Sequence, residues 1–434
     1  MSQSDTSLPD ARAHSQLTLR MCGFLHTNRL VTILFTLTAV ISLSLYNLGL
    51  GNATSRSHAH PADYYGPRTS FRDSNEIVQR YPAIDIAADK LAALQQGCSE
   101  FLLANTTQKP ATGVAPAYTS PITLPEVPKN LFFLHIFPTL EHPRYLCAIE
   151  AAAQVNPNHR ITILAENASS FELSITSLRA ALPRSVSARI QTRQLDIASY
   201  LEGTPLEPWY ANGVYKNYRA DWHKINFGDA LRLAVLWNEG GTYLDLDIIS
   251  INPVDPLSRM MSFQLEGEGL NGAALVFPPK DPFLWNLMDE YVRGYDGNHW
   301  GIQGPYLLDR TVKSICPTLA STAFKSPAVA EQQAPVPTKD PAQCTGLTIL
   351  STSAFYPISY HTADTFFAPY IGECSLLGRL RTDSYGLHWW NALFKKDPLD
   401  YDSIMGRVMR SQCLATVDTL GLERLGFKVG TSPA

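Results

Sequence analysis

The sequence lacks three features that would narrow the class of protein at once. It has no strongly basic stripe, no long run of like charge and no internal repeat. The formal net charge of −4 over 434 residues is small, so the composition favours neither a nucleic-acid partner nor a charged tail. The missing repeat argues against a solenoid. The length is sufficient for one large domain or two ordinary ones.

An uncharged apolar segment is present near the N-terminus. Residues 30–50 contain no charged side chain, and about 20 apolar residues are enough to cross a bilayer as a helix. The run exceeds the apolar core of a usual signal peptide and no sharp cleavage site follows it, which favours an anchor. A buried core helix is the alternative. Arginines flank both ends, so the positive-inside rule barely decides the orientation.

Cysteines and glycosylation sequons favour a lumenal location for the rest of the chain. Cys22 precedes the apolar segment and the other six cysteines follow it, which is compatible with disulfides in an oxidising compartment. The sequons at Asn52, Asn105 and Asn167 lie on the same side. We therefore predict a single-pass protein, divided into a cytosolic tail (1–29), a transmembrane signal anchor (30–50), a lumenal stem (51–125) and a large lumenal domain (126–434).

The domain 126–434 begins with alternating strand and helix patterns. An apolar run at 130–136, a helical pattern at 143–154 and a second apolar run at 160–164 predict an α/β fold with parallel pairing. The periodicity also predicts a helix at 223–239, which Gly240 and Gly241 end. Further strands are expected at 189–195, 242–249, 262–265 and 272–277, and further helices at 282–295 and 305–315.

Two carboxylates occupy one face of the expected strand 242–249. The period of two places Tyr243, Asp245 and Asp247 together and the intervening leucines on the other face. Open α/β sheets bind ligands at the carboxyl ends of their strands. Two carboxylate donors there suit Mg²⁺ or Mn²⁺, which would contact a diphosphate. An isolated Asp-x-Asp is more often a solvated strand end than a metal site. The choice between the two interpretations therefore depends on the neighbouring residues.

The preceding helix carries a second pair of charged residues. Asp229 and Arg232 are three residues apart and are therefore neighbours on the helix surface. The pair alone could be a surface ion pair of little energetic value. Its place directly before the glycines and the two acids favours a functional pair. In that case Asp229 contacts sugar or ribose hydroxyls and Arg232 contacts a diphosphate or the donor sugar.

Several motifs recur in one order along the chain, and together they are specific. They are FFLHI, Cys147-Ala-Ile-Glu150-Ala, Pro208-Trp209-Tyr210, DALR with YLDLD, Asn271-Gly272-Ala273, Trp300-Gly301-Ile-Gln303-Gly304-Pro305, Ala354-Phe355-Tyr356-Pro357-Ile358 and His388-Trp-Trp390-Asn391. Across residues 131–396 the chain resembles the DXD-containing glycosyltransferases of the α-1,4-galactosyltransferase and α-1,4-N-acetylglucosaminyltransferase type. The DALR and YLDLD core is also similar to glucosylating toxins and yeast mannosyltransferases.

This resemblance implies a GT-A nucleotide-sugar-binding fold, with a mixed, mostly parallel sheet and helices on both faces. It implies a UDP-sugar donor, Mn²⁺ (or Mg²⁺) and retention of the anomeric configuration. By position, Asp245 and Asp247 are the metal motif, and with Arg232 they form the catalytic group. Asp229 and Arg232 are donor contacts, and Tyr243 is a wall of the donor site.

The resemblance extends to later motifs. His388 is expected as a third metal ligand, although a core histidine between aromatic residues is an equal alternative. Trp390 and Asn391 are expected to border the donor or acceptor, with Trp390 either a platform for a sugar or a packing residue. Asn271 and Gln303 are expected to face the donor sugar or the acceptor hydroxyl.

The family pattern also bears on the cysteines. Cys316 and Cys344 match family cysteines, so a disulfide between them is implied. The partner that Cys147 has in relatives is missing from this sequence, so Cys147 is either free or paired differently.

The resemblance implies a Golgi type II membrane enzyme that transfers galactose or N-acetylglucosamine to a glycan or glycolipid in α-1,4 linkage. Its partners are then the nucleotide-sugar donor, the acceptor and the membrane, and no nucleic acid. One alternative is a GDP-mannose-dependent mannosyltransferase. Another is a catalytically inactive lumenal sugar-binding protein on the same fold.

Overall fold

The computed structural model describes residues 125–140, 142–267, 269–324, 342–362, 367 and 375–427. The predicted tail, anchor and nearly all of the stem lie outside these residues and stay predictions. Within the described ranges, no helix has both the length and the apolar character needed to cross a membrane. The described residues belong to a unit that comprises residues 60–434.

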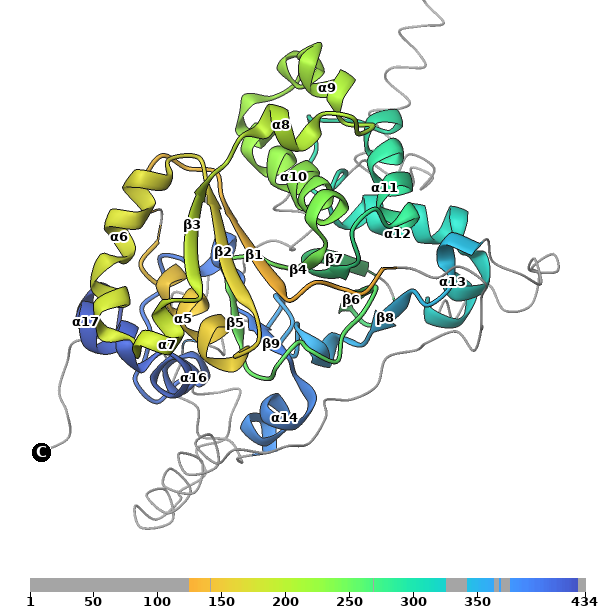
Figure 1. The fold of residues 1–434 in the computed structure, drawn as a ribbon. Coiled ribbons are helices and arrows are strands. Elements are labelled where there is room, and N and C mark those ends of the chain that lie inside the picture. Colours follow the sequence, from red (N-terminus) through yellow and green to blue (C-terminus); the bar gives the residue numbers. More distant parts are fainter. Residues whose placement is uncertain are drawn as a thin grey trace, which may run out of the picture. The chain divides into compact units, whose positions relative to one another are not determined.

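A seven-stranded sheet with the order β3-β2-β1-β4-β7-β6-β8 forms the centre of this unit (Figure 1). Strands β3, β2, β1 and β4 are parallel, β7 is antiparallel to both β4 and β6, and β8 is parallel to β6. This confirms the predicted mixed, mostly parallel sheet. The strands are β1 (Asn130–His135), β2 (Arg160–Ala165), β3 (Ile190–Gln194), β4 (Gly241–Leu244), β6 (Met260–Leu265), β7 (Gly269–Phe277) and β8 (Thr348–Leu350).

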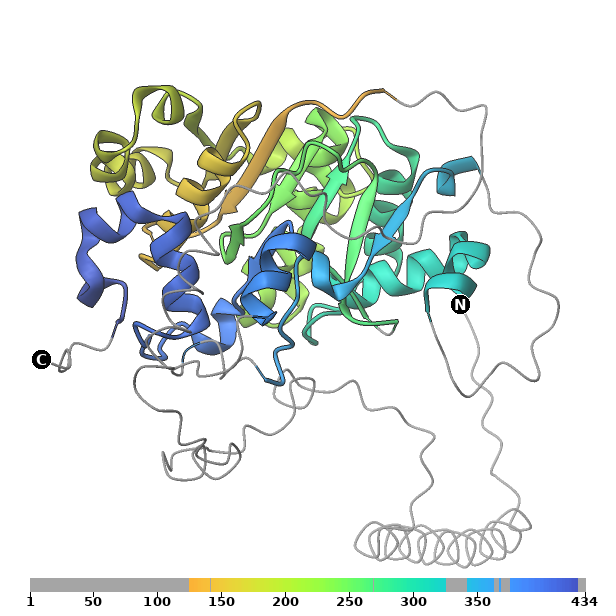
Figure 2. The ribbon, with the colours of Figure 1, turned by 90° about the horizontal axis from the view of Figure 1, so that it is seen from below.

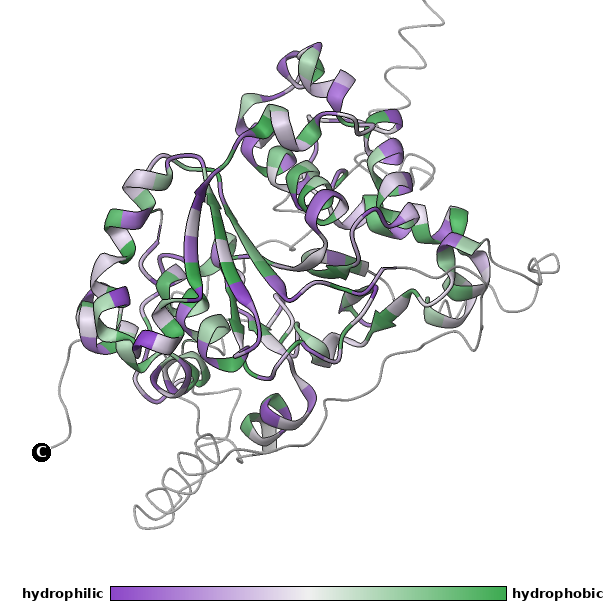
Figure 3. Ribbon diagram, in the orientation of Figure 1, coloured by the Kyte–Doolittle hydropathy of each residue, from purple (hydrophilic) through white to green (hydrophobic). Residues whose placement is uncertain are grey.

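The central strands are apolar on both faces (Figure 3). In β1, Leu131 and Phe133 belong to one hydrophobic core and Phe132 belongs to a second core on the opposite face of the sheet. Continuous apolar runs of this kind are typical of parallel strands covered by helices on both sides. Each of the two cores contains large side chains that are completely buried.

Helices cover both faces of the sheet, as predicted. The first core receives α5 (Tyr145–Val155), α6 (Ala168–Ala181), α7 (Arg184–Ser187), α14 (Ser375–Asp383), α16 (Ile404–Gln412) and α17 (Leu414–Arg424). The second core receives α8 (Ile197–Leu201), α9 (Glu207–Ala211), α10 (His223–Glu239), α11 (Pro282–Arg293), α12 (Pro305–Ile315) and α13 (Pro317–Ala323). Short helices complete the described chain: α15 (Asn391–Phe394), η1 (Val214–Asn217), η2 (Ala220–Trp222), η3 (Ala342–Cys344) and η4 (Thr352–Ala354).

Helix α10 has the predicted bounds and leads directly into β4. It ends at Gly240, whose φ of 63° lies in the left-handed region that favours glycine. A Cβ atom at Gly240 would lie 2.5 Å from Pro279 Cδ. The positive φ lets the chain leave the helix and enter the sheet within one residue, and the close approach leaves no room for a side chain there.

The predicted single strand 242–249 is wrong, because the chain breaks into two strands. Strand β4 ends at Leu244, and a turn follows in which the Ile248 amide donates to the Asp245 carbonyl at 3.0 Å. The next strand, β5 (Ile248–Ser250), pairs with β9 (Gly386–His388) in a separate two-stranded sheet. The backbone thus leaves β7 at the point where the carboxylates occur.

Two disulfides join distant segments of the described chain. Cys316 and Cys344 form a disulfide, as predicted. Cys147 forms a disulfide with Cys413, 266 residues away. Of the two states that the sequence left open, free or differently paired, Cys147 is therefore the paired one. This second disulfide links α5 to the junction between α16 and α17, and Figures 1 and 2 both show these helices side by side.

Glu150 fastens the same junction. Its side chain is fully buried in α5 and accepts hydrogen bonds from the backbone amides of Ala415 and Thr416, at 2.9 and 2.6 Å. These amides belong to the first turn of α17, where backbone donors have no partner within the helix. The Gln154 side chain donates a further bond at 2.9 Å. Glu150 therefore serves as a remote cap for α17.

Replacing this carboxylate should destabilise the domain. Glu150→Ala leaves one buried and one partly buried amide donor without an acceptor, and we expect the free energy of unfolding to fall by about 2 to 3 kcal/mol. Gln154→Ala removes only the exposed partner and should change it by less than about 0.5 kcal/mol. Urea unfolding of the full-length protein in detergent measures both. Equal effects of the two substitutions would contradict the capping role.

Candidate active site

A cavity of about 280 Å³ opens at the carboxyl end of the parallel strands. Its walls come from the end of β1, the start of α5, the first half of α10, the turn after β4, the loop before α12 and the segment around β9. Binding at this edge is expected for an open α/β sheet. The lining includes nine of the predicted site residues: Asp229, Arg232, Tyr243, Asp245, Asp247, Asn271, His388, Trp390 and Asn391.

Two acids and one histidine meet in the cavity. Asp245 and Asp247 lie in the turn between β4 and β5, and the pairing of Ile248 with His388 brings β9 alongside. His388 Nε2 lies 3.3 Å from Asp247 Oδ1, and one ligand atom from each of the three residues lies within 4.8 Å of the others. Carboxylate oxygens with an imidazole nitrogen form a donor set that suits a divalent cation such as Mn²⁺.

The protonation state of His388 also suits a metal ligand. Burial lowers the pKa of this imidazole to about 4, against the weaker opposing effect of Asp245. The ring is therefore neutral at neutral pH, which leaves a nitrogen lone pair for a ligand bond. The residues present thus fit the divalent cation that the sequence predicts.

Arg232 lies between two of the carboxylates. Its Nη2 atom is 3.4 Å from Asp229 Oδ1 and 3.4 Å from Asp245 Oδ1. The guanidinium also lies over the Tyr243 ring, 5.1 Å from its centroid, and the Tyr243 hydroxyl donates to Asp245 Oδ1. Asp229 and Arg232 are therefore no surface ion pair: their side chains are 9% and 13% exposed.

The cluster contains more negative than positive charge. Burial raises the pKa of Asp229 to about 6, with a contribution from Asp245, while Arg232 opposes the shift. Burial likewise raises the pKa of Asp245, where Arg232 opposes and Asp247 adds to the effect. Burial would lower the pKa of Arg232, but the adjacent carboxylates raise it above the usual value and keep the side chain charged. A bound divalent cation would balance the remaining charge.

Trp390 and Asn391 connect the metal cluster to other walls of the cavity. The backbone N–H of Asn391 donates to Asp247 Oδ2 at 2.9 Å, and the side-chain Nδ2 of Asn391 donates to the Tyr145 hydroxyl at 2.6 Å. Trp390 is only 3% exposed, its indole nitrogen donates to the Ile358 carbonyl, and its ring contacts His388. Trp390 is therefore packed in place, and its predicted role as a sugar platform stays a prediction.

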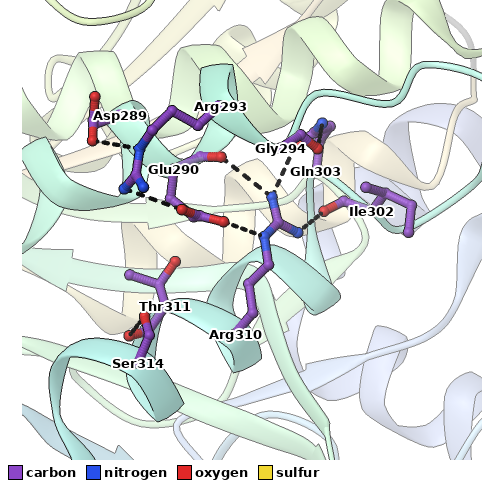
Figure 4. Close-up of polar contacts among 9 residues, drawn as sticks. All are labelled: Asp289, Glu290, Arg293, Gly294, Ile302, Gln303, Arg310, Thr311 and Ser314. Carbon is purple, nitrogen blue, oxygen red and sulfur yellow. Dashed lines mark hydrogen bonds and ion pairs between the residues drawn. The ribbon is translucent and has the colours of Figure 1, made fainter.

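Asn271 and Gln303 differ in their position. Asn271 lines the cavity and donates to Gln264 Oε1 at 2.7 Å. Gln303 is buried and is absent from the cavity lining among the described residues. Its amide instead donates to the Gly294 carbonyl at 3.0 Å (Figure 4). The next residue does reach the site, because a Cβ atom at Gly304 would lie 3.1 Å from both Asp229 carboxylate oxygens.

The cavity includes residues that the sequence did not identify as site residues. His135 ends β1, is 2% exposed and packs against Phe171, with 4.8 Å between ring centroids. Tyr145 begins α5, and Lys224 lies in the first turn of α10. The position of His135 at the end of the first parallel strand was the available signal, because ligands bind at that edge.

Comparison with known proteins identifies the class. Residues 276–420 match the family described as the alpha 1,4-glycosyltransferase conserved region, and residues 143–264 match the glycosyltransferase sugar-binding region containing the DXD motif. The lactosylceramide 4-alpha-galactosyltransferase of Rattus norvegicus is 32% identical over 275 residues, which cover 61% of this chain and 68% of that protein. The alpha-1,4-N-acetylglucosaminyltransferase of Homo sapiens is 29% identical over 266 residues, which cover 61% of this chain and 71% of that protein.

The protein is a glycosyltransferase. More particularly, the chain belongs to the α-1,4-glycosyltransferase family whose members carry a DXD sugar-binding region. Among solved structures, the PaToxG glycosyltransferase is 17% identical with a TM-score of 0.34, covering 54% of this chain and 80% of that one.

The raised pKa of Asp229 predicts a pH-dependent stability. Since the folded pKa of about 6 exceeds the ordinary 3.8, the protonated carboxyl stabilises the fold below about pH 4, and this contribution disappears as the pH rises to about 6. Relative to Asp229→Asn, the wild type should lose about 3 kcal/mol of unfolding free energy over this interval. Urea unfolding of both proteins with a metal chelator measures the difference. A difference that is independent of pH would contradict the assignment.

Proposed function

We propose that the protein transfers a hexose, galactose or N-acetylglucosamine, from a UDP-sugar to a hydroxyl of a glycan or glycolipid, in α-1,4 linkage and with retention. The observation that carries this proposal is the group of Asp245, Asp247 and His388 beside Arg232 in one cavity. Residues 126–434 are proposed as a catalytic domain of the GT-A type. The names of the family relatives support the sugar and linkage.

Asp245, Asp247 and His388 are proposed to hold Mn²⁺ or Mg²⁺. When bound, the cation would neutralise charge on the diphosphate as it leaves the sugar. The backbone N–H of Asn391 donates a hydrogen bond to the Asp247 carboxylate, and the Tyr243 hydroxyl donates one to the Asp245 carboxylate. These bonds orient the ligand oxygens before any cation arrives.

Arg232 is proposed as the charged donor to the diphosphate or donor sugar. Its guanidinium is held by Asp229, Asp245 and the Tyr243 ring, so its orientation is fixed, and its side chain is largely buried. A preorganised charge in such a position can stabilise charge on a leaving group. Asp229 is proposed to accept hydrogen bonds from sugar or ribose hydroxyls. Tyr243 supplies the wall beneath the guanidinium.

The remaining predicted residues are proposed to shape the space for sugars. Asn271 lines the cavity next to Arg232, because a Cβ at Gly272 would lie 2.9 Å from Arg232 Nη1. Trp390 and Asn391 border the metal group on the other side. Gln303 is proposed to act indirectly, because it fixes the loop in which the next residue, Gly304, packs closely on Asp229. The acceptor hydroxyl would then enter on the face of the sugar from which the diphosphate departs.

A Golgi type II orientation, with the catalytic domain in the lumen, is proposed from three features. The apolar segment 30–50 provides an anchor. Two disulfides join described segments of the domain, which suits an oxidising compartment. The sequon at Asn167 is exposed at the N-terminus of α6, where it is open to a glycan.

Removing one metal ligand should abolish transfer. Asp247→Ala is expected to reduce turnover with Mn²⁺ by at least about 100-fold while the protein stays folded. Asp255→Asn is the matched control, since this carboxylate pairs with Lys129 in a different cavity. Product formation from UDP-galactose or UDP-N-acetylglucosamine with a lactose-type acceptor measures both variants. Unchanged activity of Asp247→Ala would refute the assignment.

A donor panel tests the identity of the nucleotide sugar. We expect purified protein with Mn²⁺ to use UDP-galactose or UDP-N-acetylglucosamine, with the linkage and anomeric configuration of the product read by NMR. Preference for GDP-mannose would instead support the mannosyltransferase alternative. Binding of UDP-sugars without hydrolysis or transfer would support an inactive sugar-binding protein.

A further inference from the structure

Arg310 of α12 reaches back to the loop that precedes its own helix (Figure 4). Its Nη1 atom donates to the Ile302 carbonyl at 2.5 Å, and its Nη2 atom donates to Gln303 Oε1 at 3.4 Å. The Gln303 side chain in turn donates to the Gly294 carbonyl at 3.0 Å. Arg310 thereby fastens the second half of the loop 294–304 to the end of α11.

A carboxylate from α11 orients this guanidinium. Glu290 Oε1 accepts from Arg310 Nε at 2.9 Å, and the Glu290 carbonyl accepts from Nη2 at 3.4 Å. The same carboxylate pairs on its other oxygen with Arg293 at 3.1 Å. Arg293 is 64% exposed and pairs with Asp289 and Glu290 of its own helix, whereas Arg310 is 29% exposed. The two arginines therefore share an ion-pair partner but differ in their contact with the loop.

The opposite side of this loop forms a wall of the active site. Trp300 and Gly301 line the cavity, as does Pro305 at the start of α12. Gly304 packs so closely on Asp229 that a Cβ atom would lie 3.1 Å from both carboxylate oxygens. A shift of the loop at Gly304 would therefore displace Asp229.

This wall leads into α12, which packs on the antiparallel strand β7. Nucleotides bind at the carboxyl ends of parallel strands, which places a nucleoside near His135 at the end of β1. The metal group lies at β4 and β9. With the diphosphate at the metal, the transferred sugar and the acceptor would face the loop wall and Asp229.

We propose that Arg310 is a positioning residue for sugar transfer, which holds the 294–304 loop and hence Asp229 in place on the sugar side of the cavity. This inference rests on the proposed function. The planar guanidinium donates in several fixed directions at once, to Glu290, Ile302 and Gln303. A lysine ammonium is a point charge on a flexible stem and cannot reproduce this fork.

Arg310→Lys tests the role against a matched control, Arg293→Lys, in the full-length protein in detergent. We expect kcat/KM for transfer to fall by at least about tenfold in Arg310→Lys, because a small misplacement of positioning groups costs this much or more. The Kd of UDP with Mn²⁺, measured by calorimetry, should stay within about twofold, since UDP lacks the sugar that meets the wall. Arg293→Lys should match the wild type in both measurements.

Gly294→Ala provides a second route should Arg310→Lys fail to fold. Gly294 has a φ of −102°, which alanine adopts, but a Cβ there would lie 3.0 Å from Arg310 Nη2. The substitution should displace the Arg310 guanidinium without removing its charge. It should therefore lower kcat/KM, as Arg310→Lys does, and leave the affinity for UDP unchanged.

Three results would overturn the inference. They are wild-type kinetics in Arg310→Lys or Gly294→Ala, an equal loss in Arg293→Lys, and a parallel loss of UDP affinity that indicates general structural damage. If the wild type transfers sugar in these assays, any of these three results contradicts the positioning role of Arg310 and leaves the proposed function standing. A wild-type protein without any transfer would overturn the proposed function and this inference together.

Discussion

The Arg232 guanidinium, held between the carboxylates of Asp229 and Asp245, is the interaction on which the site depends. Without this positive charge, three neighbouring carboxylates would stand together in a partly buried cavity, where repulsion and desolvation both raise their pKa values. Arg232 offsets part of that cost and leaves a net negative charge beside Asp247. The site is therefore prepared for a cation while it still presents a positive group to a diphosphate. Helix α10 supplies Asp229 and Arg232, and it leads through Gly240 and Gly241 into β4, after which Asp245 and Asp247 follow.

The C-terminal part of the described chain completes the site from a distance. Strand β9 pairs with β5 and places His388 beside Asp247, although 141 residues separate them in the sequence. The neighbouring Asn391 binds both Asp247 and Tyr145, which begins α5. The disulfide of Cys147 with Cys413 and the buried Glu150 fasten α5 to the last helices. The metal group thus depends on long-range contacts, which couple the integrity of the whole domain to the geometry of three ligands.

The sequence predicted the mixed sheet, the bounds of α10 and nine residues of the cavity lining, because periodicity, glycine positions and short motifs are local signals. It could not predict the break between β4 and β5, because the alternation of Leu244, Leu246 and Ile248 continues across the turn and all three still pack in one core. It placed Gln303 at the donor sugar or the acceptor hydroxyl, which stays a prediction, but it did not reveal the contacts of the Gln303 side chain with Gly294 and Arg310. These contacts depend on the packing of α11 against α12, which no local pattern reveals. His135 and Tyr145 were missed as site residues because each is also an ordinary aromatic or core residue by pattern.

Diffraction at the manganese absorption edge, from crystals grown with Mn²⁺ and UDP, tests the central claim most directly. The account predicts one strong anomalous peak within ligand distance of Asp245, Asp247 and His388, with the diphosphate between this peak and Arg232. A peak elsewhere, or none in the cavity while UDP is bound, would contradict it.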